Sequence, residues 1–328
     1  MKAAVVLCAI IGGVLPSVAP AQNPAMLLTP QERDSALAHY HQTFPIWGRK
    51  AVERGIDLPK PLGFNVGIFG MEQDIKISDL GVGFNTPPQP VDFITFESAS
   101  ARLANYQSRI DLWLLPFLNV YGMAGAGYGQ TTVSLATPVQ FTSVAHFKGG
   151  NLGLGVTGTF PIRSFFGVVD FNHQWGFSSL LDNPVPANIL GLRVGHAFRI
   201  GHRSRRTKMT LWAGSMYQSL QSNTLGSIKL SEVVPPGLDS AFNNYQNQPW
   251  YIALPPGQKA LVDNFVQRLS GSLDTTVVNY QLQKRVADPW NALIGGTIDK
   301  GAHWGLRWEI GMIGRVSGMI MVNYRITL

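Results

Sequence analysis

The sequence predicts an all-β fold, a transmembrane antiparallel up-and-down β-barrel, and three observations favour it. First, 14% of the 328 residues are charged and 45% are apolar, whereas roughly a quarter of a soluble domain is charged. Second, apolar residues alternate with polar or small ones over long stretches, which is typical of strands. Third, the mean hydropathy is only +0.07, which argues against a bundle of membrane helices.

Residues 1–21 have the pattern of a secretory signal peptide. Lys2 precedes a short apolar run, and Ala19-Pro20-Ala21 ends in the small residues of a cleavage site. An uncleaved anchor is the weaker alternative, because the run is shorter than the roughly 20 residues of a membrane helix. Cleavage would remove Cys8, the single cysteine. The mature chain would then lack a thiol nucleophile, a disulfide framework and a cysteine-ligated metal site.

The clearest alternation is at the C-terminus, where bulky apolar residues from Val316 to Leu328 alternate with polar residues and Met from Arg315 to Thr327. In a soluble sandwich the apolar face points to a core. In a membrane barrel it points to lipid, and the polar, glycine-rich face lines the lumen. Long strands, charges on the small-residue face and aromatic residues at strand ends favour the barrel over a secreted β-sandwich. These aromatic residues are Trp113, Phe117, Tyr121, Trp175, Phe177, Trp290, Trp304 and Trp308.

The ending Val322-Asn323-Tyr324-Arg325-Ile326-Thr327-Leu328 resembles the terminal strand of bacterial outer-membrane β-barrel proteins. The resemblance covers the signal peptide and the strand pattern from about residue 63 onward. It departs at Leu328, where that group usually has Phe. It implies an outer-membrane location, contact with outer-membrane lipids, and recognition of Tyr324, Ile326 and Leu328 by the barrel-assembly machinery.

Both termini of such a barrel lie on the periplasmic side, so the number of strands must be even. Twelve strands are predicted, and ten is the alternative if residues 208–231 form one irregular strand. The predicted periplasmic turns include 116–119, 161–164 and the basic segment 201–208. The twelve strands are 63–77, 98–115, 119–134, 147–161, 164–177, 188–200, 208–219, 224–231, 274–284, 289–299, 303–313 and 315–328.

Residues 22–62 are predicted to form a periplasmic helical segment that precedes the barrel. A helix is expected over 29–58, because Thr29-Pro30-Gln31-Glu32 is a capping box with Pro at the first helical position. Pro45 and Gly55 should break this helix into two pieces.

The barrel region, 63–328, contains a helical insertion at about 232–272. Leu261, Phe265 and Leu269 have the spacing of an amphipathic helix within it. The count of twelve strands places this insertion on the periplasmic side, where it could contact the N-terminal helix, cap the barrel or enter the lumen. A local surface helix is the alternative.

Nine charged residues fall on the predicted inner faces of the strands, and six of them are arginines. Two interpretations stay open. Ion pairs such as Arg109–Asp111 and Arg307–Glu309 would fill a narrow barrel, whereas a cationic constriction would favour anions. The nine residues are Arg109, Asp111, Asp170, Arg193, Arg199, Arg307, Glu309, Arg315 and Arg325.

No motif predicts a catalytic, cofactor or metal site. His39 and His41 are two residues apart and point to different sides of a helix, and no His-Glu-x-x-His pattern occurs. Outer-membrane lipases place a His and a Ser near the barrel rim, but two residues after His173 this chain has Trp175. We therefore expect no enzyme, no cofactor and no nucleic-acid partner.

The expected function is a passive pore or transporter for small solutes, with an anionic solute as one candidate. A structural or adhesin-like barrel with a filled lumen is the alternative. An outer-membrane lipid-modifying enzyme is the weaker third possibility.

Overall fold

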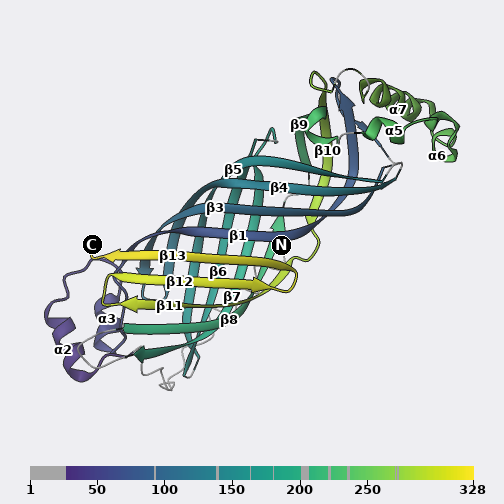
Figure 1. Cartoon of the computed structure of the whole chain (residues 1–328). Coiled ribbons are helices and arrows are strands. Elements are labelled where there is room, and N and C mark those ends of the chain that lie inside the picture. Colours follow the sequence, from purple (N-terminus) through teal and green to yellow (C-terminus); the bar gives the residue numbers. More distant parts are fainter. Residues whose placement is uncertain are drawn as a thin grey trace, which may run out of the picture.

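The fold is a closed barrel whose wall is a ring of ten antiparallel strands (Figure 1). In the computed structural model each ring strand pairs with the next one, and β13 closes the ring on β1 over the pairs Leu62↔Ile326 to Gln73↔Arg315. The ring strands are β1 (Leu62–Phe84), β3 (Thr95–Leu115), β4 (Leu118–Thr137), β5 (Phe141–Ile162), β6 (Phe165–Ser178), β7 (Val185–Ile200), β8 (Thr207–Leu220), β11 (Trp290–Lys300), β12 (Trp304–Met312) and β13 (Arg315–Ile326).

Most of the chain is described by the structure. The predicted signal peptide, 1–21, and residues 201–206 of the predicted basic turn lie outside the described residues. The described residues are 27–91, 94–137, 140–162, 164–179, 181–200, 207–220, 223–234, 237–269, 271 and 273–328.

The prediction of twelve strands is wrong, and the alternative of ten fits. The two excess strands, β9 (Asn223–Lys229) and β10 (Val277–Val286), exist but lie outside the ring. β8 pairs directly with β11, with Tyr217 opposite Trp290. β10 pairs with the second half of β1, and β9 pairs with β10. A third strand outside the ring, β2 (Gln89–Pro90), also pairs with β1.

The ring strands differ in length, with β6, β7 and β8, at 14, 16 and 14 residues, between a short group and a long group. β11, β12 and β13 have 11, 9 and 12 residues, close to the roughly 9–11 residues that cross a bilayer. β1, β3, β4 and β5 have 23, 21, 20 and 22 residues. These four strands therefore continue well beyond a membrane-length ring, on the side where β9 and β10 join them. We call this the upper end, and the end that carries Ile326 the lower end.

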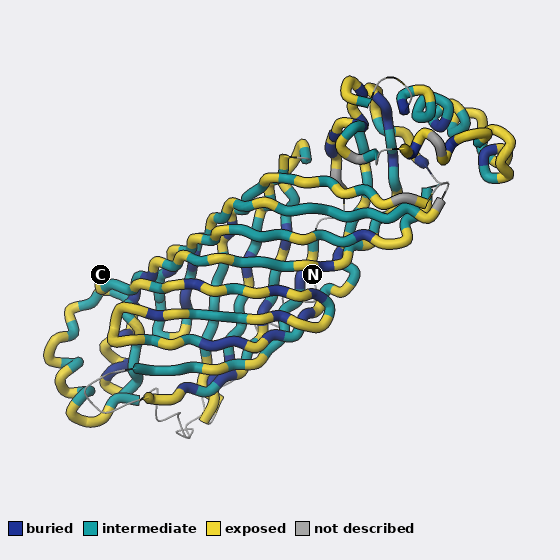
Figure 2. The backbone as a smooth tube through the Cα atoms, viewed as in Figure 1, coloured by how far each residue is buried: buried dark blue, intermediate teal, exposed yellow. Residues whose placement is uncertain are grey.

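The outer face of the membrane-length ring is an exposed apolar belt. Exposed and less exposed residues alternate along its strands (Figure 2). A continuous apolar surface of this kind is typical of a lipid-facing barrel. The belt includes Phe64, Val66, Ile68, Ile110, Leu152, Leu154, Val194, Ile294, Ile310, Ile320 and Val322, and exposed aromatic residues nearer its edges include Phe117, Trp175, Phe177, Trp290 and Trp304.

The two faces of β1 exchange character along the strand. In its first half Phe64, Val66 and Ile68 are exposed on the outside. In its second half the exposed residues include Glu72, Asp74 and Lys76, and the residue that follows each of them, Gln73, Ile75 and Ile77, faces inward. The outer face therefore changes from apolar to charged where the long strands leave the belt, while the inner face becomes apolar.

The N-terminal segment forms two helices at the lower end, α2 (Pro30–Ala38) and α3 (Gly48–Glu53) (Figure 1). The Thr29 side chain accepts a hydrogen bond from the Glu32 backbone, and the Glu32 side chain accepts one in return, so the capping box is confirmed. The expected break into two helices is present.

The insertion lies at the upper end, not on the side of the termini as predicted (Figure 1). The prediction failed because it counted β9 as a ring strand, which would have carried the chain back to the lower end. The segment consists of α4 (Leu230–Val233), α5 (Leu238–Ala241), the 3₁₀ helix η2 (Tyr245–Asn247), α6 (Pro249–Ile252) and α7 (Pro256–Leu269). Among the described residues, no helix combines the length and apolar character needed for a membrane crossing.

Candidate functional site

The ring encloses a cavity of about 1850 Å³, and every ring strand contributes to its wall. The cavity reaches from Leu28 and Asp57 of the N-terminal segment to Phe265 of α7. The structure places all nine charged residues predicted on inner faces along this wall. They are Arg109, Asp111, Asp170, Arg193, Arg199, Arg307, Glu309, Arg315 and Arg325.

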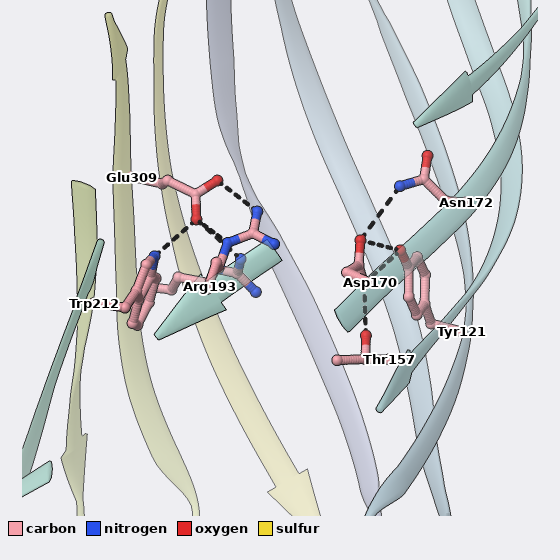
Figure 3. A network of polar contacts seen from close by, with 8 residues as sticks. Tyr121, Thr157, Asp170, Asn172, Arg193, Trp212 and Glu309 are labelled. Atoms are coloured by element: carbon pink, nitrogen blue, oxygen red, sulfur yellow. Dashed lines mark hydrogen bonds and ion pairs between the residues drawn. The ribbon is translucent and has the colours of Figure 1, made fainter. Parts of the chain in front are cut away.

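An ion-pair cluster gathers around Glu309 of β12 (Figure 3). Arg193 of β7 donates two hydrogen bonds to its carboxylate, at 2.8 and 2.9 Å. Trp212 of β8 donates a third at 2.9 Å, and Arg307 lies 3.5 Å away. The side chains of Arg193 and Glu309 are only 9% and 10% exposed. A buried bidentate contact between an arginine and a carboxylate fixes the relative positions of β7 and β12.

A glycine on an intervening strand makes the Glu309 cluster possible. Gly295 of β11 is opposite both Trp212 and Glu309 in the register. A Cβ atom at Gly295 would lie 2.8 Å from the Trp212 indole and 2.7 Å from the Trp308 carbonyl oxygen. Because Gly295 has no side chain, the indole can lie across β11 and reach the carboxylate.

A second cluster gathers around Asp170 of β6 (Figure 3). The Tyr121 hydroxyl lies 3.0 Å from both carboxylate oxygens, and the Thr157 hydroxyl donates at 2.6 Å. The Arg109 guanidinium stacks 3.5 Å from the centre of the Tyr121 ring. Tyr121 was expected among the interfacial aromatic residues, but it is buried and faces the lumen. The alternation along β4 sends it inward, on the same face as Asn119.

The predicted pair between Arg109 and Asp111 is wrong. Asp111 instead pairs with Arg325 of β13 at 3.0 Å, and Asn119 donates a hydrogen bond to it at 3.0 Å. Gly63 of β1 lies between them in the register. A Cβ atom there would be 2.2 Å from Asp111 and 2.7 Å from Arg325, so the missing side chain leaves room for the contact.

Ion pairs connect the N-terminal segment to the lower rim. Arg199 of β7 lies 3.5 Å from Glu32 and also donates to the Leu27 carbonyl oxygen. Lys208 of β8 lies 4.0 Å from Asp57. These groups are partly exposed, so each pair contributes little to stability. The segment therefore lies against the lower end of the lumen through weak contacts.

Above the charged clusters, amide side chains form a layer along the wall of β3, β5 and β6. Asn105 and Asn151 bond at 3.2 Å, Asn151 and Gln174 at 3.3 Å, and Gln174 and Asn172 at 2.7 Å. The sequence interpretation considered only charged residues and missed this layer. The signal was present, because the same alternation that places Arg109 inward also places Asn105 inward.

Above the amide layer the cavity wall becomes apolar, and we call this upper part the vestibule. A buried cluster of Phe84, Ile228, Leu230 and Val278 packs with Phe265 of α7 at its top. The vestibule wall includes Ile75, Ile77, Leu103, Val133, Leu135, Phe147, Leu220 and Leu282.

The lipase interpretation finds no support in the position of His173. Asn172 and Gln174 line the cavity, so His173 between them lies on the outer face. Its Nδ1 is 2.8 Å from the Asn188 side-chain oxygen, and its ring contacts Trp175 edge-on. Within the described part of the chain, no three His, Cys, Asp or Glu residues form a group that could hold a metal ion.

The known proteins to which this chain is similar are found among solved structures. No known family model matches the chain, and no curated protein matches it. Similar solved structures include the following three. The β domain of the Bordetella autotransporter BrkA is 10% identical, covers 81% of this chain and 100% of its own, and has a TM-score of 0.38. OprG of Pseudomonas aeruginosa is 10% identical, with 82% and 98% covered and a TM-score of 0.35. The Pseudomonas putida toluene transporter TodX is 9% identical, with 92% and 94% covered and a TM-score of 0.26.

Proposed function

We propose that this chain is an outer-membrane channel through which small solutes diffuse passively. The observation that carries the proposal is the cavity of about 1850 Å³, whose wall reaches from the N-terminal segment to α7. The exposed apolar belt supports a lipid surrounding. The ring without free edges supports it too, because a closed barrel leaves no unpaired backbone groups in lipid.

Conductance in planar bilayers tests the channel. The purified protein should give stepwise currents, and a folded but silent protein would contradict the proposal. Heat-modifiable migration on gels, in which folded barrels run differently before boiling, serves as the control for folding.

Ion selectivity provides a second test of the proposed channel. Arg307→Glu places a negative charge on the lumen wall beside Glu309, so the reversal potential in a salt gradient should shift toward cations. Arg102→Glu is the matched control, since Arg102 is exposed on the outer face where it pairs with Glu72. An equal shift in both variants would count against a path past Arg307.

A barrel with a filled lumen and a structural role is the second candidate. The burial of Arg193 and Glu309, and of Asp111 with Arg325, favours it, because paired charges there occupy space in the lower lumen. Silence in bilayers, together with normal folding, would favour this candidate.

The proposal also includes partners and processing. Outer-membrane lipids contact the apolar belt, and the assembly machinery recognises Tyr324, Ile326 and Leu328 at the end of β13. No catalytic step, cofactor or nucleic acid is part of it. Export with removal of residues 1–21 is tested by sequencing the N-terminus of the membrane-bound protein, which should begin at Gln22.

A further inference from the structure

The vestibule has two positively charged side chains in a mostly apolar wall that also includes neutral polar residues such as Gln73 and Ser143. Arg315 is the first residue of β13, and Lys284 lies on β10 opposite Ile77 of β1. Both line the cavity. Gln73, which is opposite Arg315 in the register, is four residues before Ile77, so the two cations lie one after the other along the same edge of β1.

Arg315 lacks an anionic partner among the described residues. It is 4% exposed, and the one hydrogen bond that it donates to a described residue is a long contact of 3.5 Å from Nη1 to Gln73. Its Nη2 atom is buried and has no hydrogen-bond partner within the described part of the chain. Buried guanidinium groups in proteins are ordinarily paired with a carboxylate, because an uncompensated buried charge is strongly unfavourable.

Lys284, which is half-buried, also lacks a carboxylate partner among the described residues. Burial lowers the pKa of its ammonium group, and no described carboxylate offsets this. The acids on the cavity wall all lie in the lower lumen or the N-terminal segment. They are Glu32, Asp57, Asp111, Asp170, Asp299 and Glu309. Among the described residues, the fixed charges on the vestibule wall are therefore both positive.

We propose that the vestibule binds an aliphatic monocarboxylate, with its carboxylate on the guanidinium of Arg315 and its hydrocarbon chain against the apolar wall. Lys284 adds attraction for the same head group. The inference rests on the proposed function in one respect, since it names the class of solute that would enter this lumen. Because Arg315 lines the cavity without a described carboxylate beside it, an anion in the vestibule would compensate its charge, and the apolar wall would favour a chain over a bare ion.

Calorimetric titration of the full-length protein in phosphatidylcholine nanodiscs tests the site, with empty nanodiscs as the blank. Decanoate should bind, and affinity should rise by up to about fourfold for each buried methylene. Decanol should bind about ten- to a hundredfold more weakly, because a charged hydrogen bond is lost. Acetate should bind far more weakly than decanoate. Equal affinity for decanoate and decanol, or for decanoate and acetate, would overturn the proposal.

Variants assign the site to particular residues. Arg315→Gln should weaken decanoate binding about ten- to a hundredfold, and Arg315→Lys should retain most of it. Arg102→Gln, on the outer face, should bind as the wild type does. Lys284→Gln should bind decanoate more weakly than Arg285→Gln does. Arg285 is the outward-facing neighbour of Lys284, so Arg285→Gln is the matched control. Unchanged binding by Arg315→Gln would overturn the proposal. This variant removes an unpaired buried charge, so it is expected to fold at least as stably as the wild type.

The outcomes for this site and for the channel are separable. A protein that conducts ions but does not bind decanoate would overturn the inference and leave the channel intact. A protein that binds decanoate through Arg315 but is silent in bilayers would overturn the channel and leave the binding site.

Discussion

At the scale of single residues, the buried carboxylate of Glu309 bonds to side chains from two other strands of the ring. It accepts hydrogen bonds from Arg193 and Trp212. Glu309→Gln would leave Arg193 buried without a charged partner, and we expect a loss of about 3 kcal/mol in the free energy of unfolding. Urea titration followed by heat-modifiable migration measures it. Glu72→Gln, at an exposed pair on the outer face, should cost less than about 1 kcal/mol. Equal losses in the free energy of unfolding would show that burial does not strengthen the pair between Arg193 and Glu309.

Gly295 makes room for the Glu309 cluster because it has no side chain. Gly295→Ala would place a Cβ atom 2.8 Å from the Trp212 indole and 2.7 Å from the Trp308 carbonyl oxygen. We expect a loss of about 1–3 kcal/mol in stability from this overpacking and a shift in tryptophan fluorescence as the indole moves. Gly318→Ala is the matched control, because a Cβ atom there meets nothing within 4 Å. If both variants lose the same free energy of unfolding, the Trp212 indole is not tightly packed against Gly295 of β11.

At the scale of elements, the carboxylate of Asp263 in α7 connects α7 with η2 and α6 of the insertion. The hydroxyl groups of Tyr245 and Tyr251 bond to Asp263 of α7 at 2.6 and 2.9 Å. The hydrogen bond from Tyr245, followed by the one from Tyr251, lowers the pKa of Asp263 from its ordinary 3.8. Burial, followed by the hydrogen bond to Asp263, raises the pKa of Tyr245 to about 12. A lowered carboxyl pKa stabilises the folded insertion above pH 3.8, and this contribution is lost as the pH falls through the lowered value.

Limited proteolysis across pH measures this effect. Cleavage after residues 245–268 by an acid-active protease should increase below about pH 4 in the wild type. Asp263→Asn should be cleaved at all pH values with little further change on acidification. Asp239→Asn serves as the control. A wild type that resists cleavage equally at pH 3 and pH 6 would contradict the role of Asp263.

The excess strands allow a second prediction about elements. The ring closes without β9 and β10, since β8 pairs with β11 and β13 pairs with β1. Replacing residues 223–286 by a short turn should therefore leave a heat-modifiable barrel with unchanged ring strands. The same deletion should abolish decanoate binding, because it removes part of the vestibule wall. A deleted chain that no longer folds would show that the insertion is needed for ring closure.

For the molecule as a whole, the even ring places both ends of the barrel chain together and the insertion opposite. In the proposed outer-membrane channel with its termini in the periplasm, the insertion should lie at the cell surface. An epitope tag after Gln246 should bind antibody on intact cells, whereas a tag after His41 should bind it only after permeabilisation. The reverse labelling pattern would show that the barrel is inserted the other way round.

Much of this fold could be predicted from local pattern. The alternation around Arg193, Arg307 and Arg325 depends on a period of two, and a strand carries that period whatever its neighbours are. The capping box at Thr29 is likewise local. Partners could not be predicted, because Asp111 meets Arg325 from the far end of the chain and Arg109 stacks on Tyr121. Such contacts depend on register and on which intervening residues are glycines.

The sequence by itself determined the all-β class, the apolar outer face and the inward charges, since side-chain direction along a strand follows from residue order. The tertiary structure alone decided the number of ring strands, the side of the insertion and the vestibule. β9 and β10 have the same local pattern as ring strands. Their exclusion follows from the direct pairing of β8 with β11 and from the length of β1, which continues beyond β13 and offers β10 a free edge. The two cations of the vestibule come from strands on either side of that change in partner.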